Sequence, residues 1–559
     1  MLRGRRLSLS KLPRVGARGR RPFLLPFDGS TGSPTAFCSQ GLRRPLDKII
    51  KIYKIFVIFF PFSRILCYTI YCRIIFKTSL GVIVNKHDFP QIHFYDQDFV
   101  DIYNKTWSWV SSFWIDPATG EQANDGLFIY PENGKMIINQ FESIFSSFFL
   151  VYSNRNFDAC NNLDYFYARQ EADGAIRNRY DVTTNEPIAD KKNPNGLDLP
   201  LFAWAEYNLY HKSANKRRIK EVMPTLLKYM NWIDANFKKD NGLYAVPAAA
   251  SGMTNSPRKD AVYPVDFNAC MAINASYMSA LGDILNDKEL SFQYRKMYFS
   301  IKTRINSLMW DNKTNFYYDL DKGQNRLKTK TIAGFWPMLA EIPNADKAEE
   351  LVNHLNDPKS FGTDHPFPSL SADDSNFRED GNGYCGSVFP AFNFMVIKGL
   401  EKYGKYELAR ECAIRHLYYV LDGLMPNDSK QPGDLWEAYL PTKEGKAVLK
   451  GKPGFPRKRY ILTAGLSTIA LMIENIIGLS ISLPRKTVDW IIPNLEIMGI
   501  EKLSLKRNLI TILSNKSDRG WGIQMESEKL YYFTINILDQ KKKTLPIPSG
   551  KCSMLIDKL

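Results

Sequence analysis

The chain has 559 residues, 44% of them hydrophobic, and a formal net charge of +16 at pH 7. This length allows one large domain with appendages or about three to four average domains. Residues 1–86 carry 17 Lys and Arg against 2 Asp and Glu, so the rest of the chain is close to neutral. The basicity belongs to the leader, which argues against nucleic acid as a partner of the body.

Cysteine and histidine spacing excludes two further classes of protein. The eight cysteines are scattered, none forms a CxxC pair, and with six histidines there is no spacing typical of a zinc site. Several cysteines fall on apolar stripes with helical period, which favours buried thiols over a disulfide framework.

The N-terminal region divides into two segments. Residues 1–48 are rich in Arg, Gly, Pro and Ser without periodicity, so we predict a disordered basic leader. Residues 49–86 are apolar, but Arg64 and Arg73 interrupt them, and a charge at mid-span costs about 2.5–3.5 kcal/mol. Three interpretations stay open for residues 49–84: a membrane or secretory signal anchor, another targeting segment, or upstream sequence from a wrong start site. The compartment is therefore not predicted.

From residue 90 to residue 480, helical patterns alternate with loops rich in Pro, Gly and Asn. In one of them Phe392, Met395, Val396 and Leu400 share a face, and Gly404 ends the pattern. Twelve such segments are centred near residues 104, 145, 164, 205, 226, 275, 299, 335, 350, 395, 415 and 470. Helix pairs joined by short turns either stack as a solenoid or close into a ring.

After Pro484 the apolar pattern changes to period two. The predicted strands are Leu503–Leu513, Trp521–Met525, Tyr531–Leu538 and Cys552–Ile556. Residues 484–559 are therefore predicted to form a small β-sandwich-like appendage packed on the helical body. The run Lys541-Lys542-Lys543 is interpreted as a solvated turn.

Four loops carry more polar and aromatic side chains than packing requires. They are Gln170–Arg177, Ala250–Arg258, Phe361–Val388 and Asp434–Pro441. In the last of these, Trp436 and Tyr439 flank Glu437, and aromatic rings beside a carboxylate are typical of sites that bind and cleave sugars. Structural interpretations stay open: Gly174 suits a helix C-cap, the second loop suits a capped connector, and His365 suits a buried structural histidine.

Several of these segments, in order over about residues 140–480, resemble a bacterial-type branch of glycoside hydrolase family 63. That branch is also similar to the mannosylglycerate hydrolases and the family 37 trehalases. The resemblance rests on Gln170–Ile176, Gly334–Pro337, Phe361–Asp374, Asn393–Gly404, Trp436–Pro441 and Ile469–Leu479. It implies a mainly α fold, an (α/α)6 toroid of six helix pairs with the site at one mouth.

The resemblance also implies inverting hydrolysis of an α-glucosidic or α-mannosidic bond by two carboxyl groups. Glu437 matches the general base of the family. Its acid is an aspartate in a Gly-Met-Asp-Asn-x-Pro-Arg loop, where this chain has Thr254, and a threonine cannot deliver a proton near neutral pH. Asp260 and Asp173 are the candidate replacements. Cys385, Phe389 and Thr463 also stand where relatives often carry other residues.

The implied substrate is an oligosaccharide or small glycoside, and the mechanism requires no metal or organic cofactor. The side chains expected to bind it are Trp436, Tyr439, Tyr384, Phe389, Arg258, Thr254, Asn255 and His365. Two alternatives remain. One is a non-catalytic or weakly active sugar-binding relative with the same fold. The other is a scaffold tethered to a membrane through residues 49–84.

Overall fold

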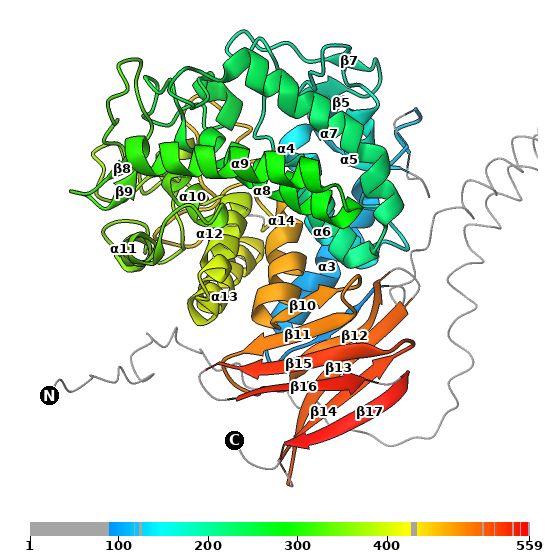
Figure 1. Ribbon diagram of the computed structural model, residues 1–559. Helices are drawn as coiled ribbons and strands as arrows, with labels where there is room; N and C mark the ends of the chain where they lie inside the picture. Colours follow the sequence, from blue (N-terminus) through cyan, green and yellow to red (C-terminus); the bar gives the residue numbers. More distant parts are fainter. Residues whose placement is uncertain are drawn as a thin grey trace, which may run out of the picture. The chain divides into compact units, whose positions relative to one another are not determined.

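The computed structural model describes residues 89–556 apart from 117, 122–125, 133, 426–432, 506–507, 519, 539–540 and 548. The predicted basic leader and the whole apolar segment after it lie outside these residues, so their predicted roles stay predictions. Within the described part of the chain, no helix is both long and apolar enough to cross a membrane. The fold is mainly α, with a β region at the C-terminal end (Figure 1).

Twelve α-helices occur among the described residues, and each lies on or beside a predicted centre. They are α3 (Gln97–Phe113), α4 (Gln140–Leu150), α5 (Asn161–Tyr167), α6 (Phe202–Ser213), α7 (Lys216–Phe237), α8 (Val265–Leu285), α9 (Lys288–Arg304), α10 (Trp336–Leu339), α11 (Ala345–Asn356), α12 (Pro390–Lys402), α13 (Tyr406–Leu424) and α14 (Ile461–Gly465). The last continues through π-helical turns at Leu466–Ala470 and Met472–Ile476. The predicted helix positions are confirmed.

The even-numbered helices form a closed inner ring. Helix α4 packs on α6, α6 on α8, α8 on α10, α10 on α12, α12 on α14, and α14 on α4. Outer helices flank them, with α5 on α4, α7 on α6 and α8, α9 on α8, and α13 on α12. Burial follows this order: most of α8 is buried, whereas α9 buries only four side chains. The predicted (α/α)6 toroid is confirmed.

Successive helices alternate between the outer and inner layers and reverse direction, so the inner helices begin at one end of the ring. A small sheet lies at that end, in the order β4-β5-β6-β7, and β5 runs directly into α4. Its strands are Tyr130–Glu132, Lys135–Asn139, Arg179–Asp181 and Glu186–Pro187. Two further hairpins pair β2 (Trp114–Ile115) with β3 (Leu127–Phe128), and β8 (Trp310–Asp311) with β9 (Phe316–Tyr317).

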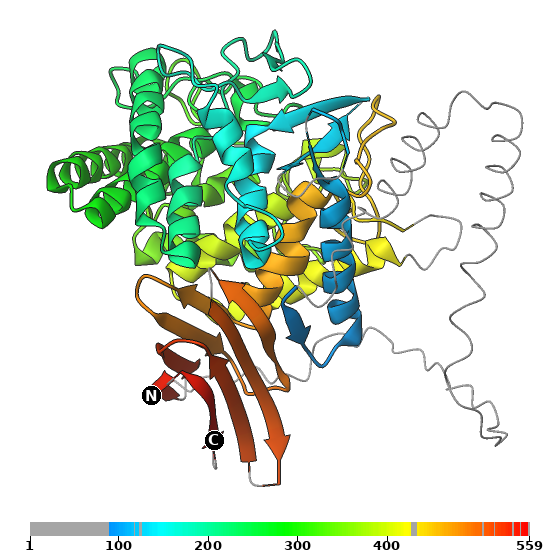
Figure 2. The ribbon, with the colours of Figure 1, turned by 90° about the vertical axis from the view of Figure 1, so that its right-hand side faces the viewer.

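The C-terminal region contains two sheets (Figure 2). One has the order β1-β12-β13-β14-β17, and the other β10-β11-β15-β16. The strands are β1 (Gln91–His93), β10 (Leu479–Ser482), β11 (Thr487–Ile492), β12 (Met498–Leu505), β13 (Asn508–Ser517), β14 (Gly520–Ser527), β15 (Tyr531–Ile537), β16 (Lys541–Ile547) and β17 (Gly550–Ile556). Alternating burial along β11 and β13 explains the period-two signal.

Three details of the predicted β region are corrected. The segment Leu503–Leu513 is divided between β12 and β13, because the chain reverses direction between Leu505 and Asn508 and the two strands pair antiparallel. The predicted turn Lys541-Lys542-Lys543 is the start of β16, which pairs with β15. Strands β10 and β11 were not predicted, so the β region begins before Pro484.

The β region is fastened to the ends of the inner helices opposite the β4–β7 sheet. Leu483 N donates to His211 O of α6 at 2.8 Å. The Trp490 indole donates to Ile477 O at 2.6 Å, and Trp490 is fully buried. The C-terminal β region therefore covers one end of the helical ring, and the other end carries the long loops.

Candidate active site

Glu437 lies in the loop before α14 and is held by one arginine. Arg457 donates to its carboxylate from Nε at 3.1 Å, from Nη2 at 2.9 Å and from the backbone N at 3.1 Å. Glu437 N in turn donates to Arg457 O at 3.0 Å. The Glu437 side chain is 16% exposed, so the carboxylate is oriented rigidly and still meets solvent.

Arg457 joins Glu437 to a second carboxylate, Glu142. Its Nη2 lies 2.9 Å from Glu142 Oε1, and its guanidinium lies 4.1 Å from the ring centre of Tyr460. The Tyr460 hydroxyl donates to Glu142 as well. Burial lowers the pKa of Arg457, but Tyr460, Glu142 and Glu437 outweigh it, and the pKa is raised well above its ordinary value. The guanidinium is permanently charged.

This carboxylate cluster, defined as Glu142, Glu437, Arg457 and Tyr460, lies at the end of the ring where the inner helices begin. Glu142 is in the first turn of α4, with Asn139 as its N-cap. Tyr460 directly precedes α14. The loops of the chain that connect outer to inner helices meet here, which is the position expected for the active site of a toroid.

Asp198 is a third carboxyl group near this end. It lies in the loop before α6, its residue is 8% exposed, and it accepts from Leu199 N at 2.7 Å. Burial raises its pKa to about 7, assisted by the charge of Glu142, while backbone hydrogen bonds from Leu199 and Phe141 oppose the rise. A buried carboxyl group that titrates near neutrality can donate a proton.

Tyr384 and Phe389 form an aromatic wall beside the cluster. Their rings stack with centres 4.6 Å apart and planes 14° apart, and Phe455 follows at 6.3 Å from Phe389. Burial raises the pKa of Tyr384 well above its ordinary value, and the charge of Glu437 adds to this effect. The structure therefore brings these two predicted residues together with Glu437.

The loop that carries Thr254 rests on the Tyr384 segment. Asn255 Nδ2 donates to Asn382 O at 2.7 Å, and its Oδ1 accepts from Tyr384 N at 2.9 Å. Thr254 itself is exposed. Asn255 thus fixes the aromatic wall through backbone groups, and Thr254 lies on the rim.

Three predicted substrate contacts are wrong, because the side chains are buried in structural networks. Arg258 is 1% exposed and pairs with Asp266 at 2.6 Å and Asp319 at 2.7 Å. His365 is fully buried and lies 2.7 Å from His416, ring nitrogen to ring nitrogen. The Tyr439 hydroxyl accepts from Trp436 N at 2.9 Å inside the core. None of them reaches the surface where a sugar would bind.

Trp436 is also buried, with Lys446 Nζ 4.7 Å above its ring. The lysine covers the face that was expected to stack on a sugar, which corrects that expectation. The tryptophan instead fills space beneath the loop and so supports the neighbouring Glu437.

Neither predicted acid contacts the cluster. Asp173 accepts from the Trp232 indole of outer helix α7 at 3.1 Å and from Ala175 N at 3.0 Å. Gly174 has φ +103°, and a Cβ there would lie 2.5 Å from Lys228 O. It is not the helix C-cap that the sequence suggested, because α5 ends at Tyr167 and its C-cap is Ala168. Asp260 is exposed, and no hydrogen bond or ion pair links it to Glu437. Asp260 was a candidate because it follows Thr254 closely in sequence. Asp173 was a candidate because it lies in a segment that resembles a family motif.

Among the described residues, no group of three or more His, Cys, Asp or Glu side chains is arranged to hold a metal ion. The residues that sequence reasoning missed are Glu142, Asp198, Arg457 and Tyr460. Only Glu142 carried a signal, because a glutamate in the first turn of a strongly apolar helix has no packing role.

Comparison with known proteins agrees with this geometry. Residues 147–447 match the family described as "Mannosylglycerate hydrolase MGH1-like glycoside hydrolase domain", which is more than half of the chain. The chain belongs to this glycoside hydrolase family. Residues 478–559 match the trehalase C-terminal domain, which covers the β region.

Relatives of this glycoside hydrolase cover different shares of it. An uncharacterized protein of Borreliella burgdorferi is 54% identical over 478 residues, 85% of this chain and 100% of that protein. A mannosyl-oligosaccharide glucosidase of Saccharomyces cerevisiae is 20% identical over 221 residues, 33% of this chain and 26% of that protein. The mannosylglycerate hydrolase of Thermus thermophilus in complex with glucose has the same fold. It has a TM-score of 0.52 and 17% identity over 66% of this chain and 98% of that chain.

Proposed function

We propose that this chain hydrolyses an α-glucosidic or α-mannosidic bond with inversion at the anomeric carbon. In such a reaction one carboxylic acid protonates the leaving oxygen and a second carboxylate activates water on the opposite face of the sugar. The observation that carries the proposal is the cluster in which Arg457 joins Glu437 to Glu142. It lies at the loop-bearing end of the ring in a member of a glycoside hydrolase family.

Glu437 is the proposed base. Arg457 donates twice to Oε2, from Nε and from its backbone N, and once to Oε1, from Nη2, so Oε1 keeps a lone-pair direction for the proton of a water molecule. The planar guanidinium fixes the carboxylate in one orientation, which an ammonium group would not do. The partial exposure of the side chain supplies the water.

Asp198 is the proposed acid in place of Thr254. Its pKa of about 7 leaves a substantial protonated fraction at neutral pH, which a leaving-group acid requires. The charges of Asp198 and Glu437 both act on the Tyr384 hydroxyl, so the two carboxyl groups share one neighbourhood. The backbone amides of Leu199 and Phe141 then stabilise the carboxylate that forms when the proton leaves.

The proposed substrate is an oligosaccharide or small glycoside. The proteins that this chain resembles include a mannosyl-oligosaccharide glucosidase, periplasmic trehalases and a mannosylglycerate hydrolase. Tyr384, which is partly exposed, offers an aromatic ring against which the C–H face of a sugar can pack, and the buried Phe389 stacks on that ring.

The test uses aryl α-glucosides, aryl α-mannosides, trehalose and mannosylglycerate with the full chain. Proton NMR during hydrolysis of the aryl glycosides should detect the β-anomer first, and a first-formed α-anomer from these substrates would contradict inversion. The Asp198→Asn variant should lose activity on natural substrates but keep it on dinitrophenyl glycosides, because that leaving group needs no proton. Asp260→Asn is the matched control and should behave as the wild type.

A second candidate is a sugar-binding relative with little or no turnover. Thr254 at the position of the family's acid favours it. The Thr254→Asp variant separates the two candidates. A rise in turnover by orders of magnitude would identify a catalytically weakened relative, whereas rapid turnover by the wild type would reject this candidate.

A further inference from the structure

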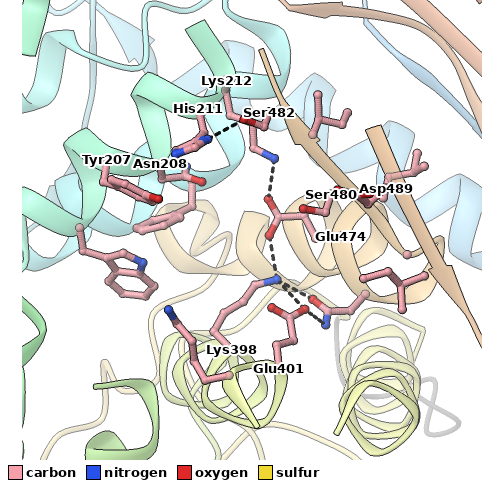
Figure 3. Close-up of a pocket in the computed structure, with 18 of the residues that line it drawn as sticks. Tyr207, Asn208, His211, Lys212, Lys398, Glu401, Glu474, Ser480, Ser482 and Asp489 are labelled. Carbon is pink, nitrogen blue, oxygen red and sulfur yellow. Dashed lines mark hydrogen bonds and ion pairs between the residues drawn. The ribbon is translucent and has the colours of Figure 1, made fainter. Parts of the chain in front are cut away.

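A cavity of about 390 Å³ lies at the end of the ring opposite Glu437. Its walls come from the later parts of α6 and α12, from the π-helical end of the α14 segment, and from β10 and β11 (Figure 3). The volume falls in the range of small-ligand sites, about 300–1,000 Å³. Because strands of the β region form one wall, the cavity exists only where that region closes the ring.

Two donors on α6 line the cavity, Lys212 and Asn208. The Lys212 side chain is 5% exposed, and its Nζ lies 3.6 Å from Glu474 Oε1 and 5.1 Å from the Tyr152 ring centre. The ammonium group forms an ion pair with Glu474 and has three N–H donors, so it can also donate to a ligand in the cavity. The Nδ2 of Asn208 is buried and makes no hydrogen bond. The two residues are four apart in one helix and so lie on the same face.

Acceptors stand across from these donors. Glu401 accepts from Lys398 Nζ and Asn475 Nδ2 through Oε1 only, at 3.1 and 2.6 Å, which leaves Oε2 available. Asp489 of β11 lines the cavity with no hydrogen bond or ion pair among the described residues. Lys398 also lies 2.8 Å from Glu474 Oε2, so the innermost charges neutralise one another.

Aromatic side chains line the remaining side of the cavity. Tyr207 lies 4.9 Å from Tyr277 and 4.5 Å from His211, measured between ring centres. Ser482 holds His211 Nδ1 at 2.8 Å, which leaves Nε2 unoccupied. At the rim Arg485 and Asp489 carry opposite charges. The cavity thus combines donors, acceptors and aromatic faces. Its lining carries four cationic side chains, Lys212, Lys398, Lys402 and Arg485, and three anionic ones, Glu401, Glu474 and Asp489.

We propose that this cavity binds a neutral mono- or disaccharide, at a site separate from the carboxylate cluster. A sugar hydroxyl both donates and accepts, so one ring can bond to Lys212 and Asn208 through its oxygens and to Glu401 and Asp489 through its protons. Its apolar face then packs on the tyrosines. An anion would leave those acceptors opposed to negative charge, and an apolar ligand would leave every buried polar group unpaired.

The experiment is calorimetric titration of the full chain with glucose, with trehalose and with inorganic phosphate. Glucose or trehalose should bind to the wild type, and Lys212→Met should weaken that binding about tenfold or more, because a charged donor is lost. Asn208→Leu removes a buried donor at constant volume, should also weaken binding, and carries the test if Lys212→Met does not fold. Lys405→Met is the control, since Lys405 pairs with Glu349 outside the cavity.

Tyr384→Ala at the other end of the ring should leave this binding unchanged, which separates the site from the proposed active site. Sugar binding that both cavity variants leave intact would overturn the proposal, and so would a complete absence of sugar binding. Binding of phosphate in preference to glucose would overturn it in favour of an anion site. These outcomes do not depend on whether Glu437 is a catalytic base.

Discussion

The two ends of the helical ring repeat one motif in different surroundings. At the loop-bearing end, Arg457 lies between Glu142 and Glu437. At the end under the sheet, Lys398 lies between Glu401 and Glu474. The first cation is a planar guanidinium beside solvent, and the second is an ammonium group enclosed by helices and strands. A cation between two carboxylates therefore does not define a catalytic site. Its role depends on whether solvent reaches the carboxylates and on whether the cation holds them in one orientation.

The acid–base behaviour of the two ends differs for the same reason. Burial would raise the pKa of Glu474, but Lys398 and Lys212 lower it to about 2. Asp198 at the other end forms no ion pair within the part of the chain that the structure describes, and burial raises its pKa to about 7. Glu474 therefore stays ionised at neutral pH, whereas Asp198 takes up and releases its proton near neutrality.

The largest expected effect is the loss of hydrolysis in Glu437→Gln. Removing a general base typically costs about 10²–10⁴-fold in rate, so kcat should fall by on the order of 10³. The unfolding transition should persist because glutamine still accepts hydrogen bonds from Arg457. Steady-state kinetics on aryl α-glycosides measure it, with Glu379→Gln on the surface as control. Equal kcat in wild type and Glu437→Gln would remove Glu437 as base.

The second effect concerns stability at the opposite end. Lys398→Met leaves Glu401 and Glu474 without their shared cation, and loss of one partner from a buried ion pair costs about 3–5 kcal/mol. Urea denaturation should show this loss, while Lys405→Met should change the free energy of unfolding by less than about 0.5 kcal/mol. An unchanged free energy of unfolding in Lys398→Met would contradict the role of Lys398 as the shared cation of Glu401 and Glu474.

The third effect is a pH dependence of opposite sign at the two ends. The folded pKa of Asp198 is raised, so its contribution to stability is complete below the unfolded value and is lost as pH rises to about 7. Asp198→Asn should therefore be more stable than the wild type at pH 8, by on the order of 2 kcal/mol. Near pH 4 the two proteins should be equal. Urea titrations between pH 4 and 8 measure the difference.

Glu474 provides the comparison for that experiment. Its folded pKa is lowered, so its contribution is present above the unfolded value of about 4.5 and is lost as pH falls toward 2. Glu474→Gln should thus be destabilised at neutral pH and approach the wild type in acid. If both variants follow the same pH trend, the contrast between the two ends is wrong.

The smallest effect is expected at Asp173, which lies outside both ends. Asparagine can accept only one of the two hydrogen bonds from Trp232 and Ala175, because its Nδ2 is a donor. Asp173→Asn should therefore keep kcat/KM within about twofold and lose about 0.5–1 kcal/mol of stability. Kinetics and urea denaturation measure both. A loss of hydrolysis comparable to that of Glu437→Gln would return Asp173 to the role of acid.

The sequence predicted the twelve helices and their pairing, because a helix that buries one face must repeat apolar residues every three to four positions. It also indicated Glu437, Tyr384 and Phe389. It did not reveal Arg457 as the partner of Glu142, since these residues are 315 positions apart and meet only when α14 closes on α4. The assignments of Arg258, His365 and Tyr439 were wrong because sequence does not distinguish an inward from an outward side chain on an irregular loop. Local periodicity fixes elements, whereas burial and charge at a site depend on segments that only ring closure brings together.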